Sequence, residues 1–511
     1  MLIQPDTNIY VLKDCPLDKT YEHTLYFDSL SAQAGYFKGL RKHTLTKQSY
    51  QRYDKGVLHI QIPAESLYDC NYLMFQNAAF GTKWFYAFIT SVEYINNVSS
   101  KVHYELDVMQ TWFFDYTLGE CFVEREHSDS DELYGNLVKE NLDLGDEYVC
   151  NKTDIFDMND MSVCMLCALD PLTGEETSEY GRVLNGVFTP LLAQGYRVAD
   201  KGLNDALVDI YVKKEGKEDA IVAIYQYPSF LGSKAHEVTD ATKVSKRVPP
   251  VGTINGYTPR NKKLFSHPYN FLLVSNNAGQ TAEYKWENWA GENDKGSFTI
   301  GGVIAPQASV ICYPNGYRGI TNDYDSGIVL NSFPQCPWVG DAFKAWLAQN
   351  RASTAASLAT TAISTIGAFV VNPTLGGASL MNLGSKVAST IAKVSDLKNT
   401  PPQVHGQTQT ETLNAGIGKV QFNFYLMSIK AQFARIIDDY FDRFGYATHK
   451  NKVPNRSVRP HWTYTKTIGC TVTGSLPADD LSSIIKIYDN GITFWKNGSE
   501  VGNYSLDNRP T

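Results

Sequence analysis

The chain is poor in charge for its length, and a basic surface is missing from it. Charged residues make up 20% of the 511 positions, the formal net charge is -8, and Lys and Arg form no long run. A protein that grips a nucleic acid needs a concentration of basic side chains, so this class of function has no electrostatic basis here. An acidic passage would instead repel phosphates and let a duplex slide past.

Catalytic and targeting motifs are missing as well. The sequence has no HExxH, GxSxG or P-loop motif. Carboxyls that work together usually come from separate elements, whereas the acidic pairs of this chain are adjacent in sequence and point in different directions. We therefore expect no enzyme and no cofactor. The first 14 residues lack the apolar stretch of a signal peptide, so synthesis in a reducing cytoplasm is expected. The acidic pairs are Glu175 and Glu176, Asp438 and Asp439, and Asp479 and Asp480.

Close cysteine pairs are scarce. The chain has nine Cys, of which only Cys164 and Cys167 are near neighbours, and no second CxxC or paired His accompanies them. We interpret these two as ordinary strand residues and expect neither a metal site nor a redox site there.

Aromatic residues, in contrast, are abundant. They make up 12% of the chain, with 31 Tyr and 24 Phe. This balance favours pleated, half-buried surfaces over helical bundles. We expect a mainly β fold, with some helix, that is divided into two to four packed units because of its length.

Short apolar runs and, at Val102–Val108, a clean alternation of apolar and polar residues locate several strands. Those expected early in the chain are Val57–Ile62, Lys83–Tyr94 and Val102–Val108, with a hairpin turn over Asn96–Ser100 between the last two. Later candidates are Phe271–Ser275, Ser309–Tyr313, Lys419–Met427 and Thr463–Thr473. A terminal hairpin is also expected, in which Asp489–Gly491 joins strands at 485–488 and 492–495.

One helix is expected just before Gly445, which occupies a C-cap position. Apolar residues recur there at the helical period, so this stripe is predicted to pack on a sheet. The stripe comprises Phe433, Ile436, Ile437, Tyr440, Phe441 and Phe444.

One segment stands apart because it carries no charge. No Asp, Glu, Lys or Arg occurs from Ala352 to Ser385, and Asn372-Pro373 and Gly376-Gly377 interrupt the run midway. This pattern indicates two arms joined by a turn. If the second arm continues past Lys386, each has about 20 residues, about enough to cross a hydrocarbon core of roughly 30 Å as a helix. The candidate membrane-active residues are Leu358, Ile363, Ile366, Gly367, Phe369, Val370, Val371, Pro373, Leu375, Gly376, Gly377, Leu380, Met381 and Leu383.

Two interpretations of this segment remain open. Apolar stretches of this length are more often helix pairs buried in a soluble core than membrane segments. A buried pair normally keeps a polar outer face, however, and charges are absent from every face of the first arm. Because Ser and Thr dilute the segment too much for a permanent anchor, a conditional membrane role fits better, with neighbouring copies shielding the loops until then.

Several stretches resemble one known family. Near the start these are Tyr72–Thr90 (YLMFQNAAFGTKWFYAFIT), Val102–Phe114 (VHYELDVMQTWFF) and Glu124–His127 (EREH). Near the end they include Tyr488–Trp495 (YDNGITFW) and Gly502–Ser505 (GNYS). All of them are similar to the tail knob, or distal tail tube, proteins of the small protein-primed short-tailed phages of the Bacillus type. The likeness is specific in roughly the first quarter and the last fifth of the chain.

The resemblance implies a homohexameric tube at the distal end of a phage tail, made in the host cytoplasm. Its partners would be the proximal tube and tail tip proteins, lipids of the host cytoplasmic membrane, and double-stranded DNA that passes through without specific binding. Six apolar loops would plug the tube and later line a membrane channel. The alternative is a receptor-binding adhesin without membrane activity. The domains expected are an N-terminal tube domain 1–127, an inserted knob region 128–335, the apolar loop 336–405 and a C-terminal part 406–511 that completes the tube domain.

Overall fold

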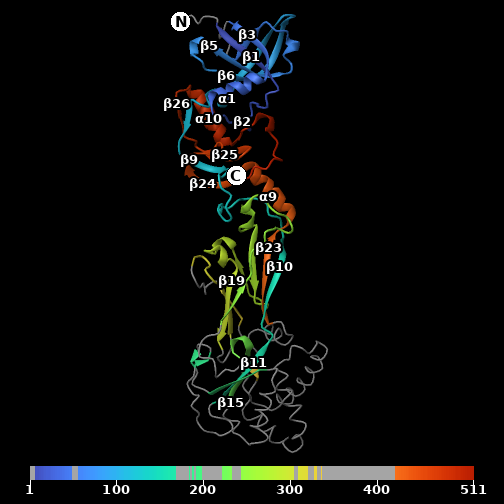
Figure 1. The fold of residues 1–511 in the computed structure, drawn as a ribbon, viewed down its shortest axis with the longest axis vertical. Coiled ribbons are helices and arrows are strands. Elements are labelled where there is room, and N and C mark those ends of the chain that lie inside the picture. The colour runs from blue at the N-terminus through green and yellow to red at the C-terminus, as the bar shows by residue number, and fades with distance from the viewer. Residues whose placement is uncertain are drawn as a thin grey trace, which may run out of the picture. The chain divides into compact units, whose positions relative to one another are not determined.

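The computed structural model describes residues 6–48, 56–167, 183–184, 187–188, 192–197, 221–232, 243–303, 309–319, 327–330, 335–336 and 420–510. The described chain is built mainly of β-strands (Figure 1), which confirms the expected fold class. The chain divides into two compact units. The first unit consists of residues 1–145, 257–264 and 431–511, and the second of residues 146–256 and 265–430.

A six-stranded antiparallel sheet holds most of the N-terminal part of the first unit. Its strand order is β3-β1-β5-β6-β7-β4. The predicted hairpin is confirmed, because β6 and β7 pair directly and are joined at Asn97 and Val98. The strand predicted to run to Val108 ends earlier, at Leu106. The strands are β1 Thr7–Lys13, β3 Arg41–Gln48, β4 Val57–Ile60, β5 Cys70–Asn77, β6 Phe85–Asn96 and β7 Ser99–Leu106.

The end of β7 is set by a helix cap. Asp107 accepts a hydrogen bond from the backbone N–H of Gln110 at 3.0 Å and so begins the short helix α2, Val108–Trp112. The Asp107 side chain is buried and also accepts a hydrogen bond from the Tyr72 hydroxyl at 2.7 Å. Burial is the main reason that the pKa of Asp107 is raised to about 6.

A second sheet of the first unit takes strands from both ends of the sequence. Its order is β2-β27-β25-β9-β24, and the β9 arrow, from the N-terminal third, lies among the red C-terminal strands in Figure 1. The β2–β27 pair is parallel and the others are antiparallel. The strands are β2 His23–Leu25, β9 Cys121–Glu126, β24 Tyr446–Lys452, β25 Trp462–Ile468 and β27 Ile492–Trp495.

The predicted strand Thr463–Thr473 divides at Gly469, which has a positive φ of 66°. Its first part is β25, and its last part is β26, Val472–Gly474, which pairs with β8, Tyr116–Leu118. Gly469 is the residue type that tolerates this left-handed backbone, so the break in the strand follows from the sequence.

The predicted terminal hairpin is wrong in its first half. Residues 485–488 belong to the helix α10, Ala478–Asn490, and only β27 is a strand. Ile484, Ile487 and Tyr488 are buried at helical spacing. Gly491, with φ 94°, ends the helix, so the turn signal is a helix C-terminus.

The predicted helix before Gly445 is confirmed as α9, Ala431–Phe444, but its buried face is rotated from the predicted one. Ile436 is 66% exposed, although it lies in the predicted apolar stripe. The buried positions are Ala434, Ile437, Asp438, Phe441 and Asp442. Two aspartates therefore share the inner face of the helix, and they displace part of the apolar stripe outward.

Aromatic rings fill the core of the first unit. Trp462 and Trp495 are fully buried on neighbouring strands, with ring centroids 5.1 Å apart. They belong to the same core as Phe37 and Tyr72, whose rings stack at 5.3 Å. This core therefore joins side chains of the N-terminal sheet to side chains of the C-terminal strands.

The second unit is also built of antiparallel sheets. The one with the longest strands has the order β10-β23-β17-β18, and two others have the orders β14-β11-β15-β22 and β16-β19-β20-β21. The predicted strands at 271–275, 309–313 and 419–427 are confirmed, as is the placement of Cys164 and Cys167 in a strand. The strands are β10 Tyr148–Asp157, β11 Met161–Cys167, β14 Leu192–Arg197, β15 Ile221–Pro228, β16 Lys243–Arg247, β17 Asn270–Ser275, β18 Thr281–Tyr284, β19 Ser297–Val303, β20 Ser309–Pro314, β21 Ile328–Leu330, β22 Gln335–Cys336 and β23 Gln421–Ile429.

Candidate functional site

The charge-free segment lies outside the described residues, together with all of the membrane-active residues named in it, from Leu358 to Leu383. The structure therefore neither groups nor separates these side chains. Within the described ranges, no helix combines the length and the apolar character that crossing a membrane requires. The membrane role of the segment stays a prediction from its sequence.

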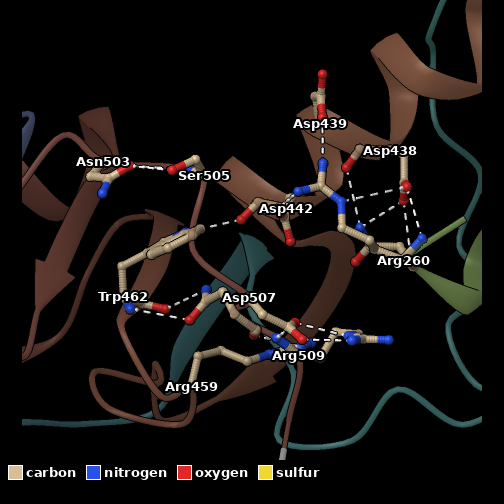
Figure 2. Close-up of polar contacts among 12 residues, drawn as sticks. Arg260, Asp438, Asp439, Asp442, Arg459, Trp462, Asn503, Ser505, Asp507 and Arg509 are labelled. Atoms are coloured by element: carbon tan, nitrogen blue, oxygen red, sulfur yellow. Dashed lines mark hydrogen bonds and ion pairs between the residues drawn. The ribbon is translucent and has the colours of Figure 1, made fainter. Parts of the chain in front are cut away.

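The described residues contain a different polar site, which sequence reasoning missed. We call it the α9 cluster and define it as Arg260, Asp438, Asp439 and Asp442, which Figure 2 labels, together with Asn261, which donates to Asp438. The three aspartates lie on α9, and the other two residues belong to the segment 257–264. This short segment is part of the first unit, although the residues before and after it, 146–256 and 265–430, belong to the second unit. Asp438 and Asp442 are spaced i, i+4, so both face this segment from successive helical turns.

Asp438 binds the returning segment with both carboxylate oxygens. Its Oδ2 accepts hydrogen bonds from the Tyr257 hydroxyl at 2.6 Å and the Arg260 backbone N–H at 2.8 Å. Its Oδ1 accepts from the backbone N–H of Asn261 at 2.9 Å and from Nδ2 of the same residue at 2.8 Å. The side chain is fully buried, so the four donors replace the water that the charge loses.

Arg260 supplies the positive charge of the α9 cluster. Its guanidinium reaches Asp439 through Nη2 and Asp442 through Nη1, the latter at 2.8 Å from Oδ2 (Figure 2). The Asp442 contact is an ion pair without hydrogen-bond geometry. Burial raises the pKa of Asp442 to about 6, and the opposing effect of Arg260 does not cancel it. Asp439, in contrast, has a side chain that is 68% exposed.

A second, buried set of ion pairs holds the C-terminal end of the segment 257–264. Lys263 Nζ lies 2.6 Å from Glu140 Oε1 and donates to the Val138 carbonyl oxygen at 2.8 Å. Arg125 contacts the other oxygen of Glu140. Both Lys263 and Glu140 are almost completely buried. Burial lowers the pKa of Lys263, and the neighbouring carboxylate of Glu140 opposes this effect.

His127 lies behind α9 and is held in one tautomer. Its Nε2 contacts the Asp442 carbonyl oxygen at 3.1 Å, and its Nδ1 accepts from the Tyr464 backbone N–H at 2.8 Å. Because Nδ1 accepts, the proton of the neutral ring is on Nε2. Burial, together with the nearby positive charge of Arg459, lowers the pKa of His127 to about 3, so the ring is neutral at physiological pH.

This arrangement of paired groups has a structural role, because it holds the segment 257–264 in place. The two oxygens of Asp438 are occupied by donors of the chain itself, and Glu140 accepts from Lys263, Arg125 and the backbone N–H of Ala447. Groups that are paired in this way hold a loop against a helix. One signal in the sequence pointed to the site, namely the two aspartates at i, i+4 on what is otherwise the apolar side of α9.

Comparisons with known proteins identify relatives along the whole chain. The family model described as Bacillus phage phi29, Tail knob protein gp9, C-terminal domain matches residues 234–509, and the model of the Caudoviral major tail protein N-terminus matches residues 5–117. The tail knob proteins gp9 of Bacillus phages phi29 and PZA are each 26% identical to this chain over 98% of both lengths. The structure of the bacteriophage C1 tail knob protein, gp12, has a TM-score of 0.64 at 12% identity and covers 98% of this chain and 99% of its own. None of these names is that of an enzyme.

Proposed function

The chain belongs to the family of the phi29 tail knob protein gp9, and from this premise we propose that six copies form the distal tube of a short tail through which the genome leaves. The protein is a structural component of the virion tail. Its proposed partners are five further copies of itself and the proximal tube and tail tip proteins.

The charge balance supports a passage that does not hold DNA. With a net charge of -8 and no basic run, the chain offers phosphates little attraction. Double-stranded DNA would therefore slide through the proposed tube without specific binding. A lumen that gripped the duplex would slow its exit, because each phosphate contact has to be released in turn.

We further propose that residues 336–405 open the host cytoplasmic membrane. The observation that carries this proposal is the absence of charge from Ala352 to Ser385. Six such loops would shield one another inside the tube before infection. A membrane is a second solvent for the same apolar faces, so contact with lipid would shift the population toward the released loops. In lipid the loops would become helical, because backbone polar groups have no water there.

Release of dye from liposomes tests this proposal. The full-length protein and a peptide of residues 352–393 are added to dye-loaded vesicles of zwitterionic and of anionic lipid over a range of pH. We expect leakage in at least one condition. The double substitution Ile366→Asp and Phe369→Asp should reduce leakage to the level of untreated vesicles, because burying a carboxylate in hydrocarbon costs about 2.5 to 3.5 kcal/mol for each Asp.

The matched control is the double substitution Ile366→Leu and Phe369→Leu, which keeps the segment apolar and should keep the leakage. Native mass spectrometry of each protein reports assembly separately. We expect a mass of six subunits for all three, because the wall of the tube is built from other residues. Equal leakage from the Asp and Leu proteins would refute the membrane role, and a monomer in every case would refute the hexamer.

A further inference from the structure

Two cysteines from opposite ends of the sequence meet in the core of the first unit. Cys121 begins β9, and Cys470 follows β25. Both belong to the same hydrophobic core, with exposures of 7% and 4%. The two thiols are within hydrogen-bonding reach of each other. The structure describes both as free cysteines.

The strand register fixes how close their backbones are. Leu118 pairs with Val472, and Phe122 pairs with Ile468. The Gly119 N–H donates to the Thr471 carbonyl oxygen at 2.8 Å between these pairs, so the register continues from one ladder to the other. Cys121 is therefore opposite Gly469 and one residue out of register with Cys470. Directly opposed residues of antiparallel strands have Cα atoms about 4.5–5.5 Å apart.

Gly469 brings the second thiol to the correct face. In a regular strand, Cys470 would point away from the face that Cys121 occupies. Gly469 has a φ of 66°, which breaks this alternation, and Cys470 packs into the same core as Cys121. Disulfides need Cα atoms about 4.4–6.8 Å apart and side chains directed at each other, and neighbouring positions on paired strands that pack into one core suit both requirements.

We propose that Cys121 and Cys470 form a disulfide after the virion has left the reducing cytoplasm. The oxidant would be a small disulfide outside the cell. The thiolate of one cysteine attacks the small disulfide, forms a mixed disulfide and expels one small thiolate. The thiolate of the second cysteine then attacks the protein sulfur of the mixed disulfide and expels the other. Two electrons pass to the oxidant, and the two protons released by the cysteines convert the expelled thiolates into thiols.

The site sets the rate of this reaction. Burial raises the pKa of Cys470 to about 12, so its reactive thiolate is scarce in the closed protein. Oxidation therefore depends on local opening of the strand ends and is slow. Once formed, the bond ties β9 to the C-terminal strands and encloses the whole second unit in one covalent loop. A long enclosed loop is where a crosslink restricts the unfolded chain most.

The test uses full-length wild-type protein in its native state. Fully reduced protein is incubated with oxidised glutathione at neutral pH, free thiols are blocked by alkylation, and the protein is digested without reduction. We expect mass spectrometry to find one main crosslink, between the peptides of Cys121 and Cys470. The oxidised protein should melt about 5 °C higher than the reduced protein.

Two substitutions provide matched controls. Cys121→Ser should abolish both the crosslink and the rise in melting temperature. Cys70→Ser should leave both unchanged, because Cys70 packs in a different core from Cys121. The wild-type digest decides the question even if a variant folds poorly. Recovery of Cys121 and Cys470 as alkylated thiols or as separate glutathione adducts would overturn the proposal, as would a main crosslink between other cysteines.

Discussion

His127 makes the stability of the first unit depend on pH. Its pKa is lowered to about 3, whereas in the unfolded chain it is near the ordinary value of 6.5. Between these values the unfolded state binds a proton that the folded state does not. Stability is therefore lost as the pH falls from about 6.5 toward 3. Asp107 and Asp442, whose pKa values are raised to about 6, act in the opposite direction.

Comparison of the wild type with His127→Gln isolates the contribution of the ring. Glutamine keeps a donor and an acceptor but does not titrate. When the pH is lowered from 6.5 to 4.5, the unfolding free energy of the wild type should fall by about 2 to 3 kcal/mol more than that of the variant. Urea denaturation at both pH values measures this difference. Equal losses in the two proteins would show that the ring is not the titrating group.

Individual residues also mark where prediction from the sequence succeeded and failed. The abundance of aromatic residues predicted a β-rich fold, and Trp462 and Trp495 are fully buried in it. Asp438 was judged only as a member of an adjacent acidic pair. Its partners Arg260 and Asn261 are more than 170 positions away in sequence, so no local pattern could connect them. Burial of a charge is decided by such distant donors.

At the scale of elements, the α9 cluster holds residues 257–264 against α9. Replacing Asp438 with Ala would remove the carboxylate that accepts from four donors, two of which are buried, and we expect the unfolding free energy to fall by about 3 to 5 kcal/mol. The adjacent Asp439→Ala should cost less than about 1 kcal/mol, because the side chain of Asp439 is mostly exposed.

Hydrogen exchange locates the effect. The backbone N–H groups of Arg260 and Asn261 donate to Asp438. A peptide spanning 257–264 should lose protection in the Asp438→Ala protein and keep it in the Asp439→Ala protein. Protection that is the same in both would mean that other contacts hold the segment.

Elements were predictable wherever one period dominated the local sequence. The strand β7 and the helix α9 have clear periods of two and of 3.6 residues. The stretch before Gly491 is ambiguous, because a short apolar run followed by Asp-Asn-Gly suits a strand and turn as well as a helix end. Packing of Ile484, Ile487 and Tyr488 decided in favour of the helix. The rotation of α9 has a similar cause, since the side-chain partners of its two buried aspartates come only from the tertiary fold.

For the whole particle, the proposed channel and the alternative adhesin predict different phenotypes. Phage that carry a deletion of Ala352–Ser385 should adsorb to cells normally but fail to deliver their genome. Binding of labelled particles and appearance of labelled DNA inside the cell measure the two steps separately. Loss of adsorption after deletion of the middle region 128–330 would favour the adhesin, and normal delivery by the Ala352–Ser385 deletion would exclude a required channel role for this segment.

The path of the chain between its two units has a practical consequence. The polypeptide passes from one unit to the other after Gly145, Gly256, Leu264 and Lys430. Each of the two segments of the second unit, 146–256 and 265–430, is thus joined to the first unit at both of its ends. A protease that nicks one surface loop of the second unit would leave two fragments that both remain attached. A virion outside a cell cannot replace its proteins, so it would tolerate such cleavages without losing a fragment.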